Sequence, residues 1–436
     1  MNRARQFKIA GKKMGISRAR AAWFFVFAIL VLAVFVLCYF ILPSYLSTSV
    51  GLNVTRPVAT STSIIATAKD PKAEFVATHV PTPSSVKAIY MTSWVAGSKD
   101  LRSKLVNIID TTEINSVVID IKDYSGRIAF SPDDPYLKEI GAFENRIPDA
   151  REFIADLHRR GIYVIGRIST FQDAYLVKLK PTLAVKRESD GAVWKDYKGI
   201  SWIDPGSKEE WKYITAIGAE SYKAGFDELN FDYIRFPSDG NMKDIAYPYS
   251  GKNSKPTVLR DFFAYLNTHL KPMGAVLSAD LFGMTTTNTD DLGIGQVLEN
   301  ALPYFDYVAP MVYPSHYPPT FMGFKNPADK PYEVVKFSMD AAVRRSIATT
   351  TKISFDGSAA IASTSPKLYP KEEFSQLKIR PWLQDFNLGA TYTAEMVDKQ
   401  IQATYDSGLN SWMLWNASNH YTVAALKVAD AVSVNQ

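Results

Sequence analysis

The sequence predicts an α/β protein, a (β/α)8 barrel preceded by a transmembrane helix and a disordered linker. Three observations lead to this prediction. Between residues 87 and 436, eight short apolar runs alternate with amphipathic stretches, whereas residues 21–42 carry no charge at all. The segment between these two parts is rich in serine, threonine and proline. With 436 residues, 47% of them hydrophobic, the chain is long enough for such a barrel and its core.

The N-terminus combines a basic tail with an apolar stretch. Residues 1–20 hold seven arginines and lysines and no acid. Residues 21–42 would form a helix about 33 Å long, which is enough to cross a hydrocarbon core of about 30 Å. Because basic flanks stay cytoplasmic, we expect a single-pass protein of the cell membrane whose remainder is extracytoplasmic. A cleaved signal peptide is the alternative, but its apolar region is usually shorter and precedes a small-x-small site.

The composition of the next segments separates a linker from a folded domain. Residues 43–86 contain 14 Ser/Thr and five Pro, which is typical of a linker. Residues 87–436, the expected barrel domain, hold 39 basic and 42 acidic side chains, so their charge is −3 although the whole chain carries +5. Nucleic-acid binding depends on many cationic contacts with phosphate, so we expect no nucleic-acid partner. The single cysteine excludes a disulfide framework.

The periodicity of residues 87–436 places strands and helices in alternation. The expected strands cover 88–94, 116–123, 162–169, 228–234, 276–283, 307–313, 379–386 and 411–417. The expected helices cover 98–112, 148–160, 207–224, 256–271, 291–303, 331–348 and 393–407. A doubly wound sheet is the rival fold, yet no GxGxxG motif follows the first strand. The stretch 349–378 has no clear period and is expected to be an insertion.

Acids, amides and aromatic side chains collect where these strands end, which is where barrels of this kind form their sites. Aromatic faces stack on sugar rings, and amides and carboxylates bond to sugar hydroxyls. The candidate substrate-binding residues are Trp94, Asp120, Arg167, Asn230, Arg235, Tyr313, His316, Trp382, Gln384, Trp415 and Asn416. Histidines and acids do not cluster at metal-ligand spacing, so we expect no metal and no cofactor.

Two carboxylates are the strongest catalytic candidates. Asp232 ends the fourth expected strand, and Asp280 lies at a similar height on the fifth. Adjacent strands are about 4.8 Å apart, so these groups can approach the roughly 5–5.5 Å separation of a retaining glycosidase. A structural ion pair with Arg167 or Arg235 is the alternative for Asp232. Asp123 is a third candidate, although its position before a Tyr-Ser-Gly segment also suits a turn.

With these residues identified, the chain resembles an uncharacterised bacterial family of glycosyl-hydrolase domains. These are TIM barrels related to the α-amylase and α-galactosidase types. The resemblance spans nearly all of 87–425 and is carried by YMTSWVAGS, VVIDIKDYSGRIAF, WIDPGSKEEW, GFDELNFDYIRFPSDG, SADLFGM, YVAPMVYPSHY, RPWLQDF and SWMLWNASNHYT. It implies hydrolysis of O-glycosyl bonds, with the family's activity inferred from its fold relationship.

The resemblance also implies roles for the two carboxylates. In the related types an Asp ending strand 4 is the nucleophile, and Asp232 matches it. The acid comes from strand 5 in the amylase type, which points to Asp280. It comes from strand 6 in the galactosidase type, where this sequence has no acid at the strand end. A chitinase-like pattern is also present, but Ile234 stands where those enzymes carry their essential Glu.

The sequence therefore predicts a membrane-anchored glycoside hydrolase that acts on extracytoplasmic polysaccharide or oligosaccharide. Asp232 is the expected nucleophile, Asp280 the acid/base and Asp123 a supporting carboxylate. The alternatives are a non-catalytic carbohydrate-binding protein and a cell-envelope interaction protein that uses the barrel as a scaffold. Polysaccharide deacetylation is disfavoured because it needs clustered metal ligands.

Overall fold

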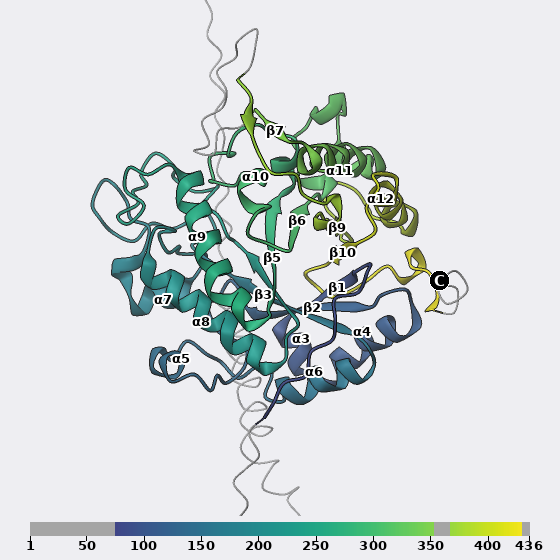
Figure 1. Ribbon diagram of the computed structural model, residues 1–436, viewed down its shortest axis with the longest axis horizontal. Coiled ribbons are helices and arrows are strands. Elements are labelled where there is room, and N and C mark those ends of the chain that lie inside the picture. Colours follow the sequence, from purple (N-terminus) through teal and green to yellow (C-terminus); the bar gives the residue numbers. More distant parts are fainter. Residues whose placement is uncertain (1–74, 353–366, 430–436) are drawn as a thin grey trace, which may run out of the picture. The chain divides into compact units, whose positions relative to one another are not determined.

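Eight parallel strands close into a barrel in the order β1-β10-β9-β6-β5-β4-β3-β2, with helices around it (Figure 1). The structure is a computed structural model that describes residues 75–352 and 367–429. The predicted (β/α)8 barrel is confirmed. The expected basic tail (1–20), the expected membrane helix (21–42) and most of the expected linker (43–86) lie outside the described residues. Within the described ranges, no helix is both long and apolar enough to cross a membrane.

Each barrel strand coincides with one of the expected apolar runs. Both faces of such a sheet are covered, which explains why these runs are apolar rather than alternating. The strands are β1 (Lys87–Met91), β2 (Ser116–Lys122), β3 (Tyr163–Ser169), β4 (Glu228–Asp232), β5 (Val276–Phe282), β6 (Tyr307–Met311), β9 (Trp382–Gln384) and β10 (Trp412–Trp415). Outside the barrel, β7 (Thr350–Thr351) pairs antiparallel with β8 (Tyr369–Pro370), in the expected insertion.

Six long helices confirm six of the seven expected ones. They are α4 (Lys99–Thr111), α6 (Ala150–Arg159), α8 (Lys208–Ala224), α9 (Lys255–Leu270), α11 (Pro331–Ile347) and α12 (Ala394–Asp406). Shorter helices are α3 (Ser93–Gly97), α5 (Pro135–Ile140) and α7 (Ala174–Leu179). The pairs α8/α9 and α11/α12 pack side by side (Figure 1). Ser207 caps α8 by accepting from the Glu210 amide, and Gly225 ends this helix with φ +115°.

The helix expected at 291–303 is wrong over most of its length, because α10 covers only Leu298–Ala301. The carboxylate of Asp291 accepts hydrogen bonds from the amides of Gly293 and Gly295, each at 3.0 Å. Leu292 and both glycines have positive φ. These bonds to the Asp291 side chain stabilise a turn, so the first turns of the expected helix do not form.

The folded part begins before Lys87, inside the expected linker. The amide of Val80 donates to Asp227 at 2.9 Å, and the amide of Val86 donates to the Ser411 hydroxyl at 3.0 Å. The Val86 side chain is buried with the residues that fill the barrel. These contacts fasten the chain to the barrel end opposite the strand C-termini.

The barrel interior contains charged side chains as well as apolar ones. At its N-terminal end, Nη2 of Arg380 donates to Glu228 at 2.8 Å, and both side chains are fully buried. The Tyr163 hydroxyl donates to the same carboxylate at 3.1 Å. A buried charge without its partner is strongly destabilising, so the pair links β4 to the segment before β9, and Tyr163 of β3 joins it.

We predict that Arg380→Met destabilises the protein by roughly 3–5 kcal/mol, because it leaves the buried Glu228 carboxylate without its cation. Adding Glu228→Gln should recover most of that loss, since no charge is then left unpaired. Urea unfolding of the two single variants and the double variant measures the coupling. A double variant no more stable than Arg380→Met would contradict the pairing.

Candidate active site

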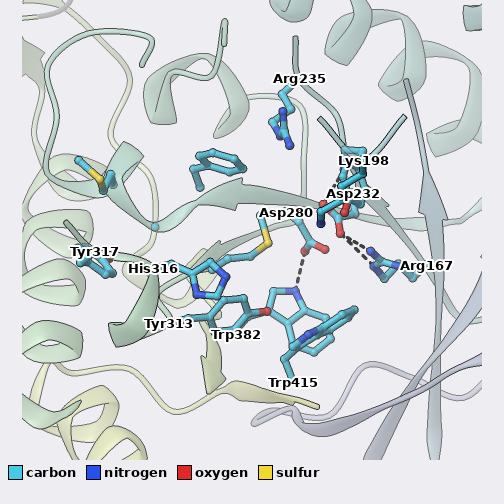
Figure 2. A pocket seen from close by; sticks show the side chains of 15 residues that line it. Arg167, Lys198, Asp232, Arg235, Asp280, Tyr313, His316, Tyr317, Trp382 and Trp415 are labelled. Carbon is cyan, nitrogen blue, oxygen red and sulfur yellow. Dashed lines mark hydrogen bonds and ion pairs between the residues drawn. The ribbon is translucent and has the colours of Figure 1, made fainter. Parts of the chain in front are cut away.

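A cavity of about 430 Å³ opens at the C-terminal ends of the strands (Figure 2). This volume is typical of small-ligand pockets. Its walls come mainly from the ends of β3 to β6, β9 and β10 and the loops that follow them. The lining residues are Arg167, Lys198, Asp232, Tyr233, Arg235, Asp280, Phe282, Gly283, Met284, Met311, Tyr313, His316, Tyr317, Trp382 and Trp415.

Asp232 ends β4 and is held by an arginine. Its Oδ2 accepts from Nε of Arg167 at 3.1 Å and from Nη2 at 2.5 Å, and its Oδ1 accepts from the Tyr233 amide at 2.5 Å. Nη1 of Arg167 donates to Asp120 at 2.7 Å. Burial opposes the charge of Arg167, but Asp232 and then Asp120 outweigh it and raise the pKa of the guanidinium. Asp232 is therefore a carboxylate with a fixed counter-charge.

The backbone changes direction directly after Asp232. Tyr233 has φ +48°, in a region that residues with a Cβ seldom occupy. Such strain persists where the surrounding structure enforces it, which is often at functional sites. Here the positive φ occurs where β4 ends and the loop that carries Arg235 begins, and the Tyr233 amide donates to the Asp232 carboxylate.

Asp280 lies on β5 in a different environment. Its Oδ1 accepts from Nδ2 of Asn230 at 2.9 Å and from Nε1 of Trp382 at 2.8 Å, and both donors are neutral. Burial, and next the negative charge of Asp232, raise the pKa of Asp280 well above its usual value. The two carboxyl groups are neighbours, but their environments differ. Environments that move the pKa values of two groups apart are typical of acid/base pairs in active sites.

The register of the sheet explains why these two groups meet. Asn230 pairs with Ser278 and Phe231 with Ala279, so the next step along both strands sets Asp232 beside Asp280. Because side chains alternate with period two, both residues share the inward face with Asn230. Figure 2 shows the two carboxyl groups as neighbours in the pocket, each with its own hydrogen-bond partner.

Aromatic side chains form another part of the pocket wall, beside Asp280. Trp415 packs edge-on against Trp382 with ring centroids 5.6 Å apart, and it stacks on Tyr90 at 4.0 Å. Tyr313 contacts His316 edge-on at 5.3 Å. Burial, and then the charge of Lys198, lower the pKa of His316. The wall is thus mostly apolar, with a histidine that favours its neutral form.

Several candidate residues support the pocket from behind. Asp120 accepts from the Tyr90 hydroxyl at 2.5 Å and from Arg167, and Asn230 donates to Asp280. Gln384 bonds to the backbone of Ser315. These contacts hold lining residues or their loops in position, and none of these three side chains lines the cavity itself.

Three other candidates lie outside the cavity lining. The Asp123 carboxylate accepts from Arg146 at 2.7 Å, and the guanidinium of that arginine lies 4.5 Å from the Trp94 ring. The indole of Trp94 stays exposed beside this pair. Asn416 donates to the carbonyl of His420 and shapes the loop after β10. A catalytic part for Asp123 therefore stays a prediction.

The structure adds lining residues that the sequence did not single out, notably Lys198, Phe282 and Met284. Phe282 and Met284 follow Asp280 closely, so the expectation that site residues lie at the C-terminal ends of strands also applies to them. Lys198 lies in an irregular loop before α8, where no periodicity indicates its position. In the described part of the chain, no group of three or more His, Cys, Asp or Glu side chains is placed to hold a metal ion.

A (β/α)8 barrel with two inward carboxyl groups at its mouth has the architecture of glycoside hydrolases. The sequence matches the family model described as "Putative glycosyl hydrolase domain" over residues 88–421. The chain belongs to this family of glycosyl hydrolase domains. No curated protein matches the sequence of this chain.

One solved structure supports the fold. The PgaB (BpsB) glycoside hydrolase domain from Bordetella bronchiseptica is 14% identical and aligns with a TM-score of 0.53, over 81% of this chain and 98% of that one. This likeness shows a shared fold. A hypothetical protein from Ruminiclostridium thermocellum is 36% identical over 47% of this chain and 98% of that one, with a TM-score of 0.41. An α-galactosidase from Thermus thermophilus is 12% identical over 76% and 58%, with a TM-score of 0.43.

The raised pKa of Asp280 predicts a pH-dependent stability difference from Asp280→Asn. The stability that the neutral carboxyl contributes is complete below the unfolded-state pKa of about 3.9 and is lost as pH rises through the higher folded-state pKa. Each unit of the raised pKa corresponds to about 1.4 kcal/mol. Relative to the variant, the wild type should therefore lose stability as pH rises in this window.

Urea unfolding at a series of pH values measures this difference. Asp398→Asn, which changes an exposed side chain on α12, is the matched control and should show no such trend. A difference between wild type and Asp280→Asn that is constant with pH would contradict a raised pKa for Asp280.

Proposed function

We propose that this protein is a glycoside hydrolase that cleaves a polysaccharide or oligosaccharide by a two-carboxylate mechanism. The observation that supports this most is the pairing at the ends of β4 and β5. Asp232 is fixed by the Arg167 cation, and the neighbouring Asp280 is buried among neutral donors. One group is suited to attack and the other to hold a proton.

In this mechanism Asp232 is the nucleophile. Its carboxylate attacks the anomeric carbon while the Asp280 carboxyl donates its proton to the departing glycosidic oxygen. A covalent glycosyl intermediate forms on Asp232. Asp280, now a carboxylate, then takes a proton from a water molecule that attacks this intermediate and releases the sugar. Positions one strand apart favour the short separation of retaining enzymes, about 5–5.5 Å, over the longer one of inverting enzymes.

The neighbouring side chains suit a sugar substrate. The aromatic wall of Trp415, Trp382 and Tyr313 offers ring faces and edges against which the C–H faces of a pyranose pack. Arg167 keeps Asp232 in place because its guanidinium is anchored on the other side by Asp120. The substrate thus meets a nucleophile that needs little reorganisation.

We also propose that the apolar stretch 21–42 anchors the protein in the cell membrane and that the barrel acts on extracytoplasmic glycan. The support is the uncharged 22-residue length together with the basic tail before it. Cell fractionation tests this proposal. The full chain should stay in the membrane pellet after alkaline carbonate, a chain lacking 1–42 should not, and protease added outside the cell should reach the barrel domain.

We predict that Asp280→Asn lowers turnover of a natural glycan by roughly 10²–10⁴-fold, because the leaving oxygen is no longer protonated. The amide keeps an oxygen that accepts from Asn230 and Trp382, so the fold should be retained. An aryl glycoside with a good leaving group needs no proton, so its first step should survive and release a burst of phenol.

Asp232→Asn should instead abolish both the burst and the steady-state rate, because no glycosyl intermediate can form. Asp398→Asn, the exposed carboxylate of α12, is the matched control and should behave as the wild type does. Full turnover in either active-site variant refutes the assigned role. Glycan binding without any product from the wild-type protein would instead indicate a carbohydrate-binding protein.

A further inference from the structure

The pocket contains a second arginine, which forms no ion pair with a described residue. Arg235 is only 7% exposed. Its Nη1 donates to the carbonyl of Phe236 at 2.9 Å, and in the described part of the chain the guanidinium makes no other hydrogen bond and no ion pair. A guanidinium has five N–H donors, so most donors of Arg235 have no acceptor in the described part of the protein, and the residue lines the cavity.

Aromatic rings fix this guanidinium in place. Its central carbon lies 4.8 Å from the ring centre of Trp202, 4.6 Å from that of Phe282 and 5.5 Å from that of Tyr233. Burial lowers the pKa of Arg235, as expected for a cation removed from water, yet arginine stays charged at neutral pH. Arg235 is therefore a positioned and poorly hydrated cation.

Three acids, Asp232, Asp239 and Asp196, act electrostatically on Arg235, but in the described part of the chain none of them forms an ion pair with it. The Asp232 carboxylate forms an ion pair with Arg167, and burial raises the pKa of Asp280 well above its usual value. Lys198 adds a second cation to the same lining, and it has no ion pair with a described residue. Figure 2 shows Arg235 and Trp415 on opposite sides of the carboxyl pair, with no bond drawn from Arg235 to another lining residue. A buried charge without a partner destabilises a fold unless a ligand supplies the counter-charge.

We propose that the glycan bound in this pocket carries a carboxylate and that Arg235 is the residue that recognises it. A planar carboxylate matches the guanidinium fork and accepts two parallel hydrogen bonds, while Lys198 strengthens the field around it. The inference rests on the proposed function in that it places a sugar in the cavity. The carboxylate can belong to a hexuronic acid or to the lactyl ether of a muramic acid, and the test separates these sources.

The test compares substrates that differ only in this charge. For the full chain in detergent, kcat/KM is measured on an oligouronide and its carboxyl-reduced form, and on muramic-acid glycan strands with free and amidated lactyl groups. In the wild type, one of the acidic substrates should be preferred over its neutral partner by roughly 10- to 100-fold. Arg235→Gln should remove most of this preference, and Arg235→Lys, which keeps the charge without the fork, should be intermediate.

Lys243→Gln is the matched control, because it removes one exposed cation outside the pocket lining and should leave the preference unchanged. The melting temperature of Arg235→Gln should equal or exceed that of the wild type, because an unpaired buried cation has been removed. A lower melting temperature together with an unchanged preference would show that Arg235 has a structural role and overturn the proposal.

Calorimetric binding of the same four glycans to Asp280→Asn separates this inference from the proposed function. The carboxylate proposal is overturned if Asp280→Asn binds the acidic and the neutral glycan of each pair with equal affinity. It is also overturned if the wild type cleaves both glycans equally well, and in that case the hydrolase assignment still holds. Binding that requires both the carboxylate and Arg235, without cleavage of any glycan by the wild type, overturns the hydrolase assignment and supports the carboxylate site.

Discussion

The site depends on one interaction, the bridge that the Arg167 guanidinium forms between Asp120 and Asp232. Two carboxyl groups one strand apart in a buried place cannot both be charged without a cation nearby. Because the bridge gives Asp232 a cation, the burial of Asp280 and the charge of Asp232 together raise the pKa of Asp280. If Arg167 were lost, the two groups would compete for one proton and their separate roles would no longer be defined.

The barrel supplies the rigidity that this bridge needs. Along β4 the inward positions are Glu228, Asn230 and Asp232, and each bonds a side chain of a neighbouring strand: Glu228 bonds Tyr163, Asn230 bonds Asp280, and Asp232 bonds Arg167. Glu228 also bonds Arg380, which precedes β9. The polar contacts therefore follow one another along β4, from the N-terminal end of the barrel to its C-terminal end. A site built on strands is held more precisely than one built on loops, since every side chain inherits the register of the sheet.

Much of the fold, and the position of Asp232 and Asp280, could be predicted from the sequence. Apolar runs and period two place these residues on one face, and the structure confirms the strands concerned. The partner of Asp232 could not be predicted, since Arg167 and Arg235 both lie near strand ends. The positive φ of Tyr233 interrupts the alternation of β4, so Arg235 lies among Trp202 and Phe282 and does not pair with Asp232. The turn at Asp291 was missed because a side-chain bond to the backbone has no apolar period.

The two arginines divide two tasks that one residue could not perform. All three nitrogens of the Arg167 guanidinium donate to Asp232 or Asp120, so this residue has little capacity left for a substrate. Arg235 differs from Arg167, since it packs against ring faces and most of its N–H donors have no acceptor in the described part of the protein. Aromatic rings hold a guanidinium without using its N–H groups, whereas carboxylates use them. Arg167, which is bound by two carboxylates, therefore orients the proposed nucleophile. Arg235, which packs against aromatic rings, remains available to an anionic ligand.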